Sequence, residues 1–435
     1  MSKAAQSGLG VSPAASRPDG QPTSVRHGVI YFAVALGMIT YIDRVCISNA
    51  APMIRRDLGL SVDQMGYVFS AFAIAYALFE IPCGHLCDRI GARQVLMRIV
   101  LWWSFFTAAT GWAWSFTSMI VTRFLFGAGE AGCFPSITRA FTTWLPRKER
   151  SRAQGIVWLS ARWGGALTPI LAGSVIAYFG WRHAFEIFGC LGVVWAIVFY
   201  RWYRDNPFDK PEMNEAERAL MRDIEPPTQH GRAPWLPLIS SPHVWLLCIQ
   251  YFCLSYGWYF YITWLPTYLR EGRGLALTSS LLLGGLPLFF GGIGNPTGVL
   301  LNSWLTRRTG NLRLARKSIA CAGFTGASAF LILSTRVHDP VMAILAISMA
   351  SFSNDLVMSG AWTSTMDIGG KYAGTVSGAM NMFGNFAGVL APALVGYILK
   401  ETGDWNLTFY ISAAIYAGGI VCWALIDPVT PLVAE

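Results

Sequence analysis

Charged residues stand in the middle of two apolar stretches of the chain, and they are the residues best placed to do chemistry. Asp43 and Arg44 interrupt one stretch near the N-terminus, and Arg123 and Glu130 interrupt a later one. Charge at the depth of a membrane is costly, so such residues usually face a partner or a water-filled path. An arginine can bind an anion, and an acid between burial and a nearby arginine can gain or lose a proton. Two acids and two arginines in these places predict a protein that moves an anion, with protons.

The composition supports a membrane protein. Of the 435 residues, 54% are hydrophobic and 13% are charged, whereas a soluble domain carries about 25% charged residues. The net charge of +9 could indicate nucleic acid binding, but the basic residues cluster in connectors between apolar segments, so we expect no nucleic acid partner. We expect an all-α protein with twelve membrane-spanning helices, at residues 29–51, 64–84, 95–115, 118–142, 153–178, 183–203, 243–268, 279–304, 315–335, 340–366, 373–399 and 406–427.

One long polar connector divides the chain into two sets of six spans. The expected parts are a disordered tail (1–26), a six-helix bundle (27–204), a linker (205–241), a second six-helix bundle (242–428) and a short tail (429–435). Arginine and lysine concentrate in alternate connectors, which predicts that both termini are cytoplasmic. A weak repeat relates the halves: Pro169, Gly173, Trp181 and Phe185 correspond to Pro392, Gly396, Trp405 and Phe409.

The connector after the second span carries a recognisable pattern. Gly84, Asp88, Arg89, Gly91 and Arg93 occur at the spacing that resembles the loop signature of the major facilitator superfamily. The glycines let the helix end turn, and the Asp88 carboxylate can make and break contacts as a gate moves. The alternative is an ordinary turn with solvated charges. The resemblance implies a cytoplasmic gate formed by these five residues.

Further stretches are similar to the anion:cation symporter family, which includes hexuronate, aldonate and phthalate transporters. They are residues 41–44, 123–135, 264–269 and 381–385. In that family the acids carry protons and the arginine binds the substrate carboxylate. The resemblance therefore implies proton carriage by Asp43 and Glu130 and substrate anchoring by Arg44. Arg123 and Glu130 lie two turns apart on one helix face, so we expect Arg123 to take part in proton coupling by favouring the ionised form of Glu130. The alternative is a structural ion pair, and Arg123 fits that alternative best.

Other polar groups in apolar helices complete the expected site. The candidates for binding substrate are Tyr76, Arg162, Trp258, Tyr261, Asn381 and Asn385. Aromatic residues also populate membrane interfaces, and amides also join helices, so each has an alternative role. Arg162 and Asp355 can pair across the halves, or Arg162 can supply a second positive point for a dianion. The role of Glu80 stays open, and many members of the family carry glutamine there.

These observations lead to one interpretation: a transporter with its site between two bundles near the membrane midplane, taking up an organic carboxylate with protons. A sugar acid such as an aldonate or hexuronate is the expected substrate. The sequence implies no metal and no organic cofactor, and the proton gradient supplies the energy. We expect a monomer in the lipid bilayer of the cell inner membrane and no enzymatic activity. The alternatives are an organic anion exporter or exchanger, and a transporter-like nutrient sensor.

Overall fold

The computed structural model describes residues 21–221, 240–369 and 373–430, without the side chains of residues 81, 84, 85, 88, 147, 148, 151 and 373–375. Every regular element in these ranges is helical. The first half contains α1 (Gly28–Leu58), α2 (Val62–Ile90), α3 (Ala92–Gly111), α4 (Phe116–Glu130), α5 (Cys133–Trp144) and α6 (Arg147–Trp202). The second half contains α9 (Pro242–Thr263), α10 (Leu265–Thr267), α11 (Leu277–Gly284), α12 (Leu286–Thr309), α13 (Leu312–Arg336), α14 (Pro340–Gly369), α15 (Ala373–Thr402) and α16 (Trp405–Leu425).

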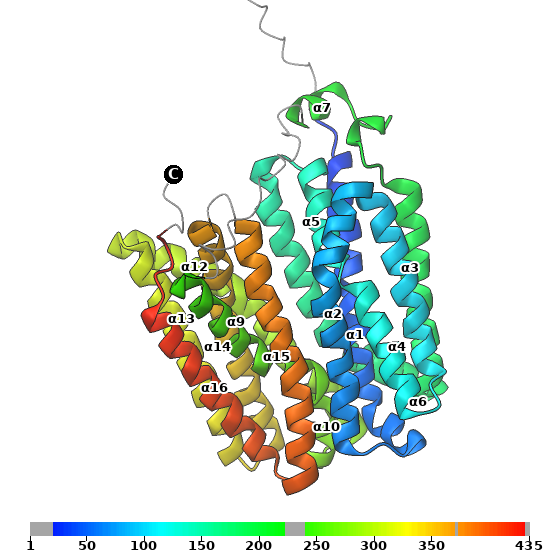
Figure 1. Ribbon diagram of the computed structural model, residues 1–435, viewed down its shortest axis with the longest axis vertical. Coiled ribbons are helices and arrows are strands. Elements are labelled where there is room, and N and C mark those ends of the chain that lie inside the picture. Colours follow the sequence, from blue (N-terminus) through cyan, green and yellow to red (C-terminus); the bar gives the residue numbers. More distant parts are fainter. Residues whose placement is uncertain (1–20, 222–239, 370–372, 431–435) are drawn as a thin grey trace, which may run out of the picture.

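The described helices form the twelve expected crossings in two side-by-side bundles (Figure 1). α6 holds two crossings, because the chain turns at Gly180, whose φ of 79° suits glycine. α4 and α5 together make one crossing, as do α11 and α12. A further crossing joins α9, α10 and the π-helix η3 (Tyr268–Gly272).

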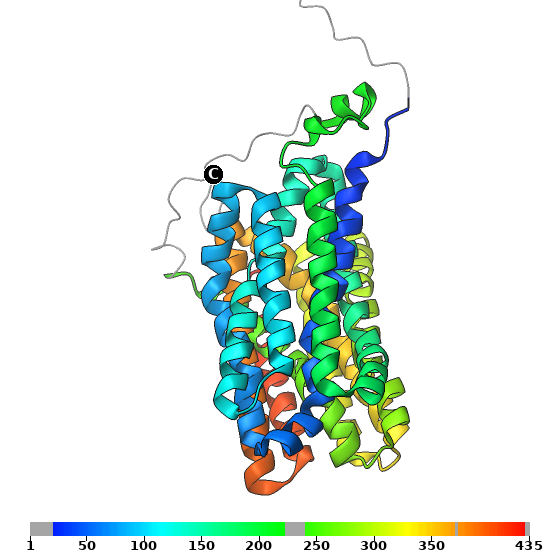
Figure 2. The same cartoon turned by 90° about the vertical axis from the view of Figure 1, so that its right-hand side faces the viewer.

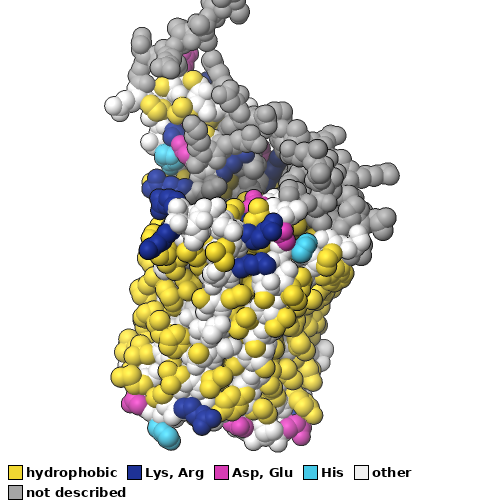
Figure 3. Space-filling view, turned by 90° about the vertical axis from the view of Figure 1, so that its left-hand side faces the viewer, with side chains coloured by type: hydrophobic (Ala, Val, Ile, Leu, Met, Phe, Trp, Pro, Cys, Tyr) yellow, Lys and Arg dark blue, Asp and Glu magenta, His cyan; other side chains and the backbone are white. Residues whose placement is uncertain are grey.

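Eight of the described helices are long and apolar enough to cross a membrane by length and composition alone. The face shown in Figure 3 agrees with this, since apolar side chains cover its middle and charged side chains gather toward its two ends. Large apolar side chains of the helices are well exposed, for example Leu300 at 69% and Leu282 at 60%. A surface of this kind is stable against lipid chains rather than against water.

The linker begins with a 3-10 turn, η2 (Pro207–Asp209), and a short helix, α7 (Glu215–Met221). α7 lies beyond one end of the first bundle (Figure 2), and we call this side of the molecule the linker end. The opposite end contains the connection between α1 and α2. Residues 1–20 of the expected tail and residues 222–239 of the expected linker lie outside the described residues.

The last residues of the expected tail are fixed rather than disordered, which corrects that part of the prediction. A 3-10 turn, η1 (Val25–His27), precedes α1. Arg26 is 7% exposed and forms ion pairs of 3.0 Å with Glu149 and with Glu217, while Thr23 Oγ1 donates to Glu217 over 2.5 Å. Two carboxylates from α6 and α7 therefore fasten the start of the chain to the first bundle, a pairing between distant segments that composition does not reveal.

The two bundles approach each other closely where glycine replaces a side chain. A Cβ atom on Gly285, between α11 and α12, would collide with the backbone carbonyl oxygen of Ala166 on α6. On the other side of the interface α2 packs along α15, and Ser70 Oγ donates to the carbonyl oxygen of Val389 over 2.6 Å. Small residues at such contacts are typical of helices that pack closely within a membrane.

Candidate functional site

Arg44 lies at the meeting point of α1, α2 and α4. Its Nε donates to Oε1 of Glu130, the last residue of α4, and the exposed fractions of the two side chains are 8% and 0%. The guanidinium carbon lies 4.8 Å from the ring centre of Tyr76, 5.1 Å from Phe72 and 5.4 Å from Tyr41. Three aromatic faces and one carboxylate thus hold a cation away from water, which strengthens its attraction for an anion.

Asp43 makes no hydrogen bond to this cluster although it precedes Arg44, and Glu130 acts on it only electrostatically. Successive residues on an α-helix are rotated by about 100°, so the two side chains serve different neighbours. Asp43 is 1% exposed and faces Arg123 and Trp103 inside the first bundle, but its geometry with the Trp103 indole falls short of a hydrogen bond. Neither carboxylate oxygen of Asp43 has a hydrogen-bond partner among the described residues. A buried acid without such a partner is suited to binding a proton.

Arg123 is fully enclosed by the first bundle. Its guanidinium carbon lies 4.2 Å from the ring centre of Phe126, and it interacts electrostatically with both Glu130 and Asp43. The ion pair of Glu130 is made with Arg44 rather than with Arg123. Arg123 therefore neutralises the interior around the two acids without pairing directly with either one.

Local sequence explains why α4 brings Glu130 so close to α1 and α2. A Cβ atom on Gly127 would collide with the backbone carbonyl oxygen of Phe72, so only glycine permits this approach of α4 to α2. Glu130 then ends α4, and the chain turns through residues 131–132 before α5 begins. The carboxylate is therefore placed by a helix end that glycine allows to pack tightly.

Arg162 and Asp355 form an ion pair across the two bundles, one of the two arrangements that the sequence left open. Nη2 of Arg162 on α6 lies 3.1 Å and 3.2 Å from the two carboxylate oxygens of Asp355 on α14. The guanidinium carbon also lies 4.8 Å from the ring of Trp258, which packs in turn against Tyr41 at 6.0 Å. This pair and the two aromatic rings join the bundles next to Arg44.

A second polar group bridges the bundles on the other side of the site. Glu80 on α2 accepts hydrogen bonds from Nδ2 of Asn381 (2.6 Å) and of Asn385 (3.2 Å), both on α15. The Tyr259 hydroxyl donates to Oδ1 of Asn385 over 3.1 Å. Tyr76, one turn before Glu80, links this group to Arg44.

Tyr261 lies elsewhere. It is 2% exposed, and its hydroxyl faces Tyr416 of α16 inside the second bundle. The structure therefore brings Arg44, Tyr76, Arg162, Trp258, Asn381 and Asn385 to the interface between the bundles, and it separates Tyr261 from them. An aromatic helix such as α9 presents side chains all round, so its sequence alone does not tell which ones reach the interface.

The expected gate residues are only partly described. Only the helical backbone is described at Gly84 and Asp88, without the Asp88 side chain, and Arg89 is exposed. Gly91 has a φ of 87° and Arg93 donates from its backbone N–H to Asp205 over 3.0 Å. The Arg93 guanidinium also donates to the carbonyl oxygen of Tyr200, so these contacts stay within the first bundle and its linker. The gate role remains a prediction.

At the opposite end, two ion pairs connect the bundles. Arg55 at the end of α1 lies 3.1 Å from Glu271 in η3, and Lys400 near the end of α15 lies 3.1 Å from Asp63 at the start of α2. Hydrogen bonds from Ser61 and Lys400 lower the pKa of Asp63 from its usual range, which favours the charged form that pairs. Among the described residues, the ion pairs at the linker end each stay within one half of the chain.

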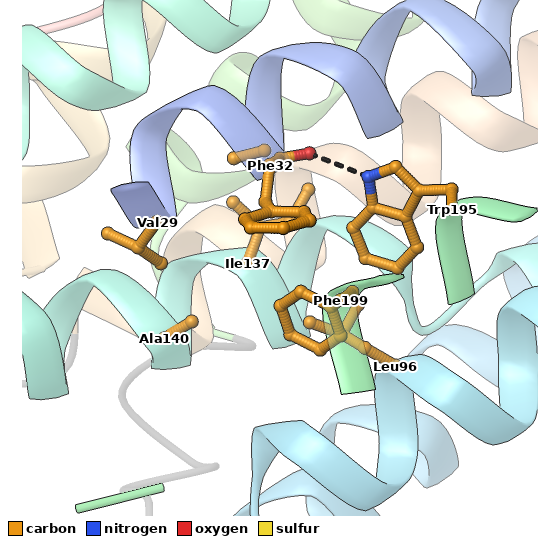
Figure 4. A pocket seen from close by; sticks show the side chains of 8 residues that line it. Val29, Phe32, Leu96, Ile137, Ala140, Trp195 and Phe199 are labelled. Carbon is orange, nitrogen blue, oxygen red and sulfur yellow. Dashed lines mark hydrogen bonds between the residues drawn. The ribbon is translucent and has the colours of Figure 1, made fainter. Parts of the chain in front are cut away.

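A small cavity inside the first bundle has a different character from this site. Val29, Phe32, Ile137 and Phe199 line it with apolar surface, and its volume is about 10 Å³ (Figure 4). One polar contact is present, the hydrogen bond of 3.0 Å from the Trp195 indole to the carbonyl oxygen of Phe32. A space near the size of one water molecule with apolar walls is a packing defect rather than a binding site.

Sequence reasoning missed several residues that shape the site. They are Phe72, Trp103 and Asp205, together with Tyr41 as a cation–π partner of Arg44. The four-residue spacing of Phe72 and Tyr76 on one helix face was the available signal for an aromatic wall. The other residues come from helices that meet only in the folded chain.

Comparisons with known proteins agree with this architecture. Residues 33–392 match the protein family described as "Major Facilitator Superfamily". The chain is 38% identical to the probable sulfoacetate transporter SauU of Cupriavidus necator, over 94% of this chain and 95% of that protein. It is 29% identical to the hexuronate transporter of Bacillus subtilis, over 91% of this chain and 92% of the relative.

Solved structures show the same fold. A bacterial homologue of the human lysosomal transporter Spinster, in an inward-facing and unoccupied conformation, superposes with a TM-score of 0.71 at 19% identity. The alignment covers 94% of this chain and 96% of that one. The family match, the fold and the named relatives confirm the resemblance drawn from the sequence motifs. The chain belongs to the major facilitator superfamily and is a multi-pass membrane transporter, not an enzyme.

Proposed function

We propose that the protein takes up a small organic anion together with protons, by alternating access of a site between its two bundles. The observation that carries the proposal is the buried pair of Arg44 and Glu130 beside three aromatic rings. Arg44 anchors a carboxylate or sulfonate, and Glu130 and Asp43 carry protons. An anion that binds Arg44 has to compete with Glu130, and a proton on Glu130 removes that competition.

Charge balance supports the coupling. Among the charged residues of the site described above, the acids outnumber the arginines by one: Asp43, Glu80, Glu130 and Asp355 against Arg44, Arg123 and Arg162. An entering anion increases this negative excess in a poorly solvated region. Protons bound by the acids offset it, so anion entry and proton entry favour each other.

The relatives narrow the class of substrate. Their names include sulfoacetate, hexuronate and galactarate or D-glucarate, all of which are small oxygen-rich anions. We place the protein in the cell inner membrane with the linker end in the cytoplasm, because basic residues concentrate in the connectors expected there. The start of α1 and the end of α16 both lie toward the linker end (Figure 1).

The test uses the purified protein in liposomes with an imposed pH gradient and radiolabelled sulfoacetate, glucuronate or gluconate. One pH unit corresponds to about 1.4 kcal/mol, so with one proton per substrate it supports an accumulation of about tenfold at most. We expect the parent protein to accumulate substrate and Glu130→Gln to lose accumulation but retain counterflow. Arg44→Lys should lose both, because lysine does not reproduce the bidentate guanidinium fork.

Arg98→Lys is the matched control, since Arg98 is an exposed arginine on α3 that donates a hydrogen bond to Gln94 of the same helix. It should transport like the parent. Normal transport by Arg44→Lys would remove Arg44 as the anchor. Undiminished accumulation by Glu130→Gln would move the coupling to another acid or another ion.

A further inference from the structure

Glu80 accepts hydrogen bonds from two side-chain amides that could otherwise bind a substrate. The proposed roles of Arg44 as anchor and of Asp43 and Glu130 as proton carriers do not involve it. Each of its carboxylate oxygens accepts one hydrogen bond, from Asn381 over 2.6 Å and from Asn385 over 3.2 Å. We propose that Glu80 determines substrate specificity. It accepts a hydrogen bond from a hydroxyl at the far end of a monoanionic substrate and excludes a second anionic group there. The inference rests on the proposed function, because it takes Arg44 as the anchor of the first anionic group.

The orientation of the Asn385 amide is fixed by a third group. The Tyr259 hydroxyl donates to Oδ1 of Asn385, so the amide nitrogen of Asn385 faces Glu80. Asn381 and Asn385 are four residues apart on α15 and therefore share a helix face. Two donors from one helix then converge on one carboxylate of the other bundle, which holds Glu80 as an acceptor at the contact between the bundles.

Glu80 and Arg44 lie on the same side of α2. Tyr76 stands one turn before Glu80, and its ring centre is 4.8 Å from the Arg44 guanidinium. Arg44 and Glu80 also interact electrostatically. A small molecule whose anionic group binds Arg44 therefore extends past Tyr76 toward Glu80, so the two charges define two ends of one site.

The two ends favour different chemical groups. A hydroxyl can donate to Glu80 without disturbing Asn381 or Asn385. A second carboxylate would compete for the same amides and would stand beside a like charge in a poorly solvated space. Arg162, which could have balanced that charge, is already paired with Asp355 at 3.1 Å. The site thus selects a monoanion with a hydroxyl at its far end.

The experiment measures kcat/KM in liposomes for two matched pairs of probes. Gluconate and glucarate, like isethionate and sulfoacetate, differ only by a terminal hydroxymethyl group in place of a carboxylate. We expect the parent to prefer the hydroxyl-bearing member of the pair that it transports by at least tenfold. Glu80→Gln, which removes the charge at nearly constant size, should reduce that preference at least tenfold.

Two further variants separate charge from structure. Glu80→Asp retains the carboxylate and should keep the preference. Asp63→Asn removes a different contact between α2 and α15, the ion pair with Lys400, and should leave the ratio of the two probes unchanged. The preference of the parent itself is informative even if Glu80→Gln fails to insert.

Equal or better transport of the dianions by the parent would overturn the assignment of Glu80, as would an unchanged ratio in Glu80→Gln. These outcomes leave proton-coupled anion uptake intact. Transport of none of the four probes would instead reject the substrate class of the proposed function, and the role of Glu80 with it. The failures of the two proposals are therefore distinguishable.

Discussion

Asp355→Asn is the perturbation whose effect the structure defines best. The parent pair is buried, with exposed fractions of 7% for the Arg162 side chain and 1% for Asp355, and its atoms approach to 3.1 Å. The substitution leaves an unpaired guanidinium in that place. Removing one partner of a buried pair costs about 3–5 kcal/mol, so we expect the free energy of unfolding to fall by about 3 kcal/mol.

The double variant Arg162→Gln with Asp355→Asn should be more stable than Asp355→Asn alone. Both charges are then absent, and replacing a complete buried pair with neutral groups is often close to neutral. Some loss remains because Arg162 also packs against Trp258. The expected coupling between the two sites is about 1–3 kcal/mol.

Thermal unfolding in detergent, followed with a thiol-reactive dye on buried cysteines such as Cys46 and Cys253, ranks the variants. The expected order of melting temperature is parent, double variant, then Asp355→Asn. A double variant no more stable than Asp355→Asn would refute the reasoning, because removing the second charge would then bring no relief. A tighter anion affinity in Asp355→Asn would show that the freed Arg162 serves the substrate.

Three further predictions concern the ends of the molecule. Arg55→Glu or Glu271→Arg alone should lower the transport rate severalfold, because this ion pair joins the bundles. The double variant, which exchanges the two charges, should restore the rate, and a double variant as slow as the single variants contradicts this. Asp88→Asn should change turnover and two-sided cysteine accessibility more than affinity, and unchanged accessibility would remove the gate role. A hydrogen bond from Arg26 lowers the pKa of Glu149 below its usual 4.5, so its contribution to fastening residues 21–27 is fully present above about pH 4.5 and declines as the pH falls toward the lowered pKa. Hydrogen exchange should therefore show that Glu149→Gln loosens this segment more at pH 6 than at pH 3.5.

The length of the apolar stretches and the polar connectors between them made the fold predictable. Each expected span overlaps a described crossing, because about 20 apolar residues cannot satisfy their backbone in lipid except as a helix. The breaks within crossings were not predictable. Nothing in the stretch 123–135 distinguishes a continuous helix from α4 and α5 with a turn between them, since the turn depends on how glycines pack against α2 and α3.

The site was predictable only as a set of charged residues, not as a set of pairs. Spacing placed Arg123 and Glu130 on one face, but Glu130 pairs with Arg44 of another helix. Asp43 and Arg44 are neighbours in sequence and yet face different surroundings. Pairing depends on the rotation and contact of whole helices, which hydrophobic periodicity alone does not determine.

Both ends of the proposed site are occupied by carboxylates of the protein itself. Glu130 pairs with the cation that anchors the substrate, and Glu80 accepts hydrogen bonds from the amides at the other end. At the Arg44 end a bound anion therefore exchanges one carboxylate contact for another of the same chemistry, which limits the net gain in affinity and keeps release possible. Glu130 pairs within the first bundle, whereas Glu80 bridges α2 and α15. Substrate binding at the Glu130 end can thus change protonation without separating the bundles, while a hydroxyl that donates to Glu80 adds to the contact that alternating access has to break.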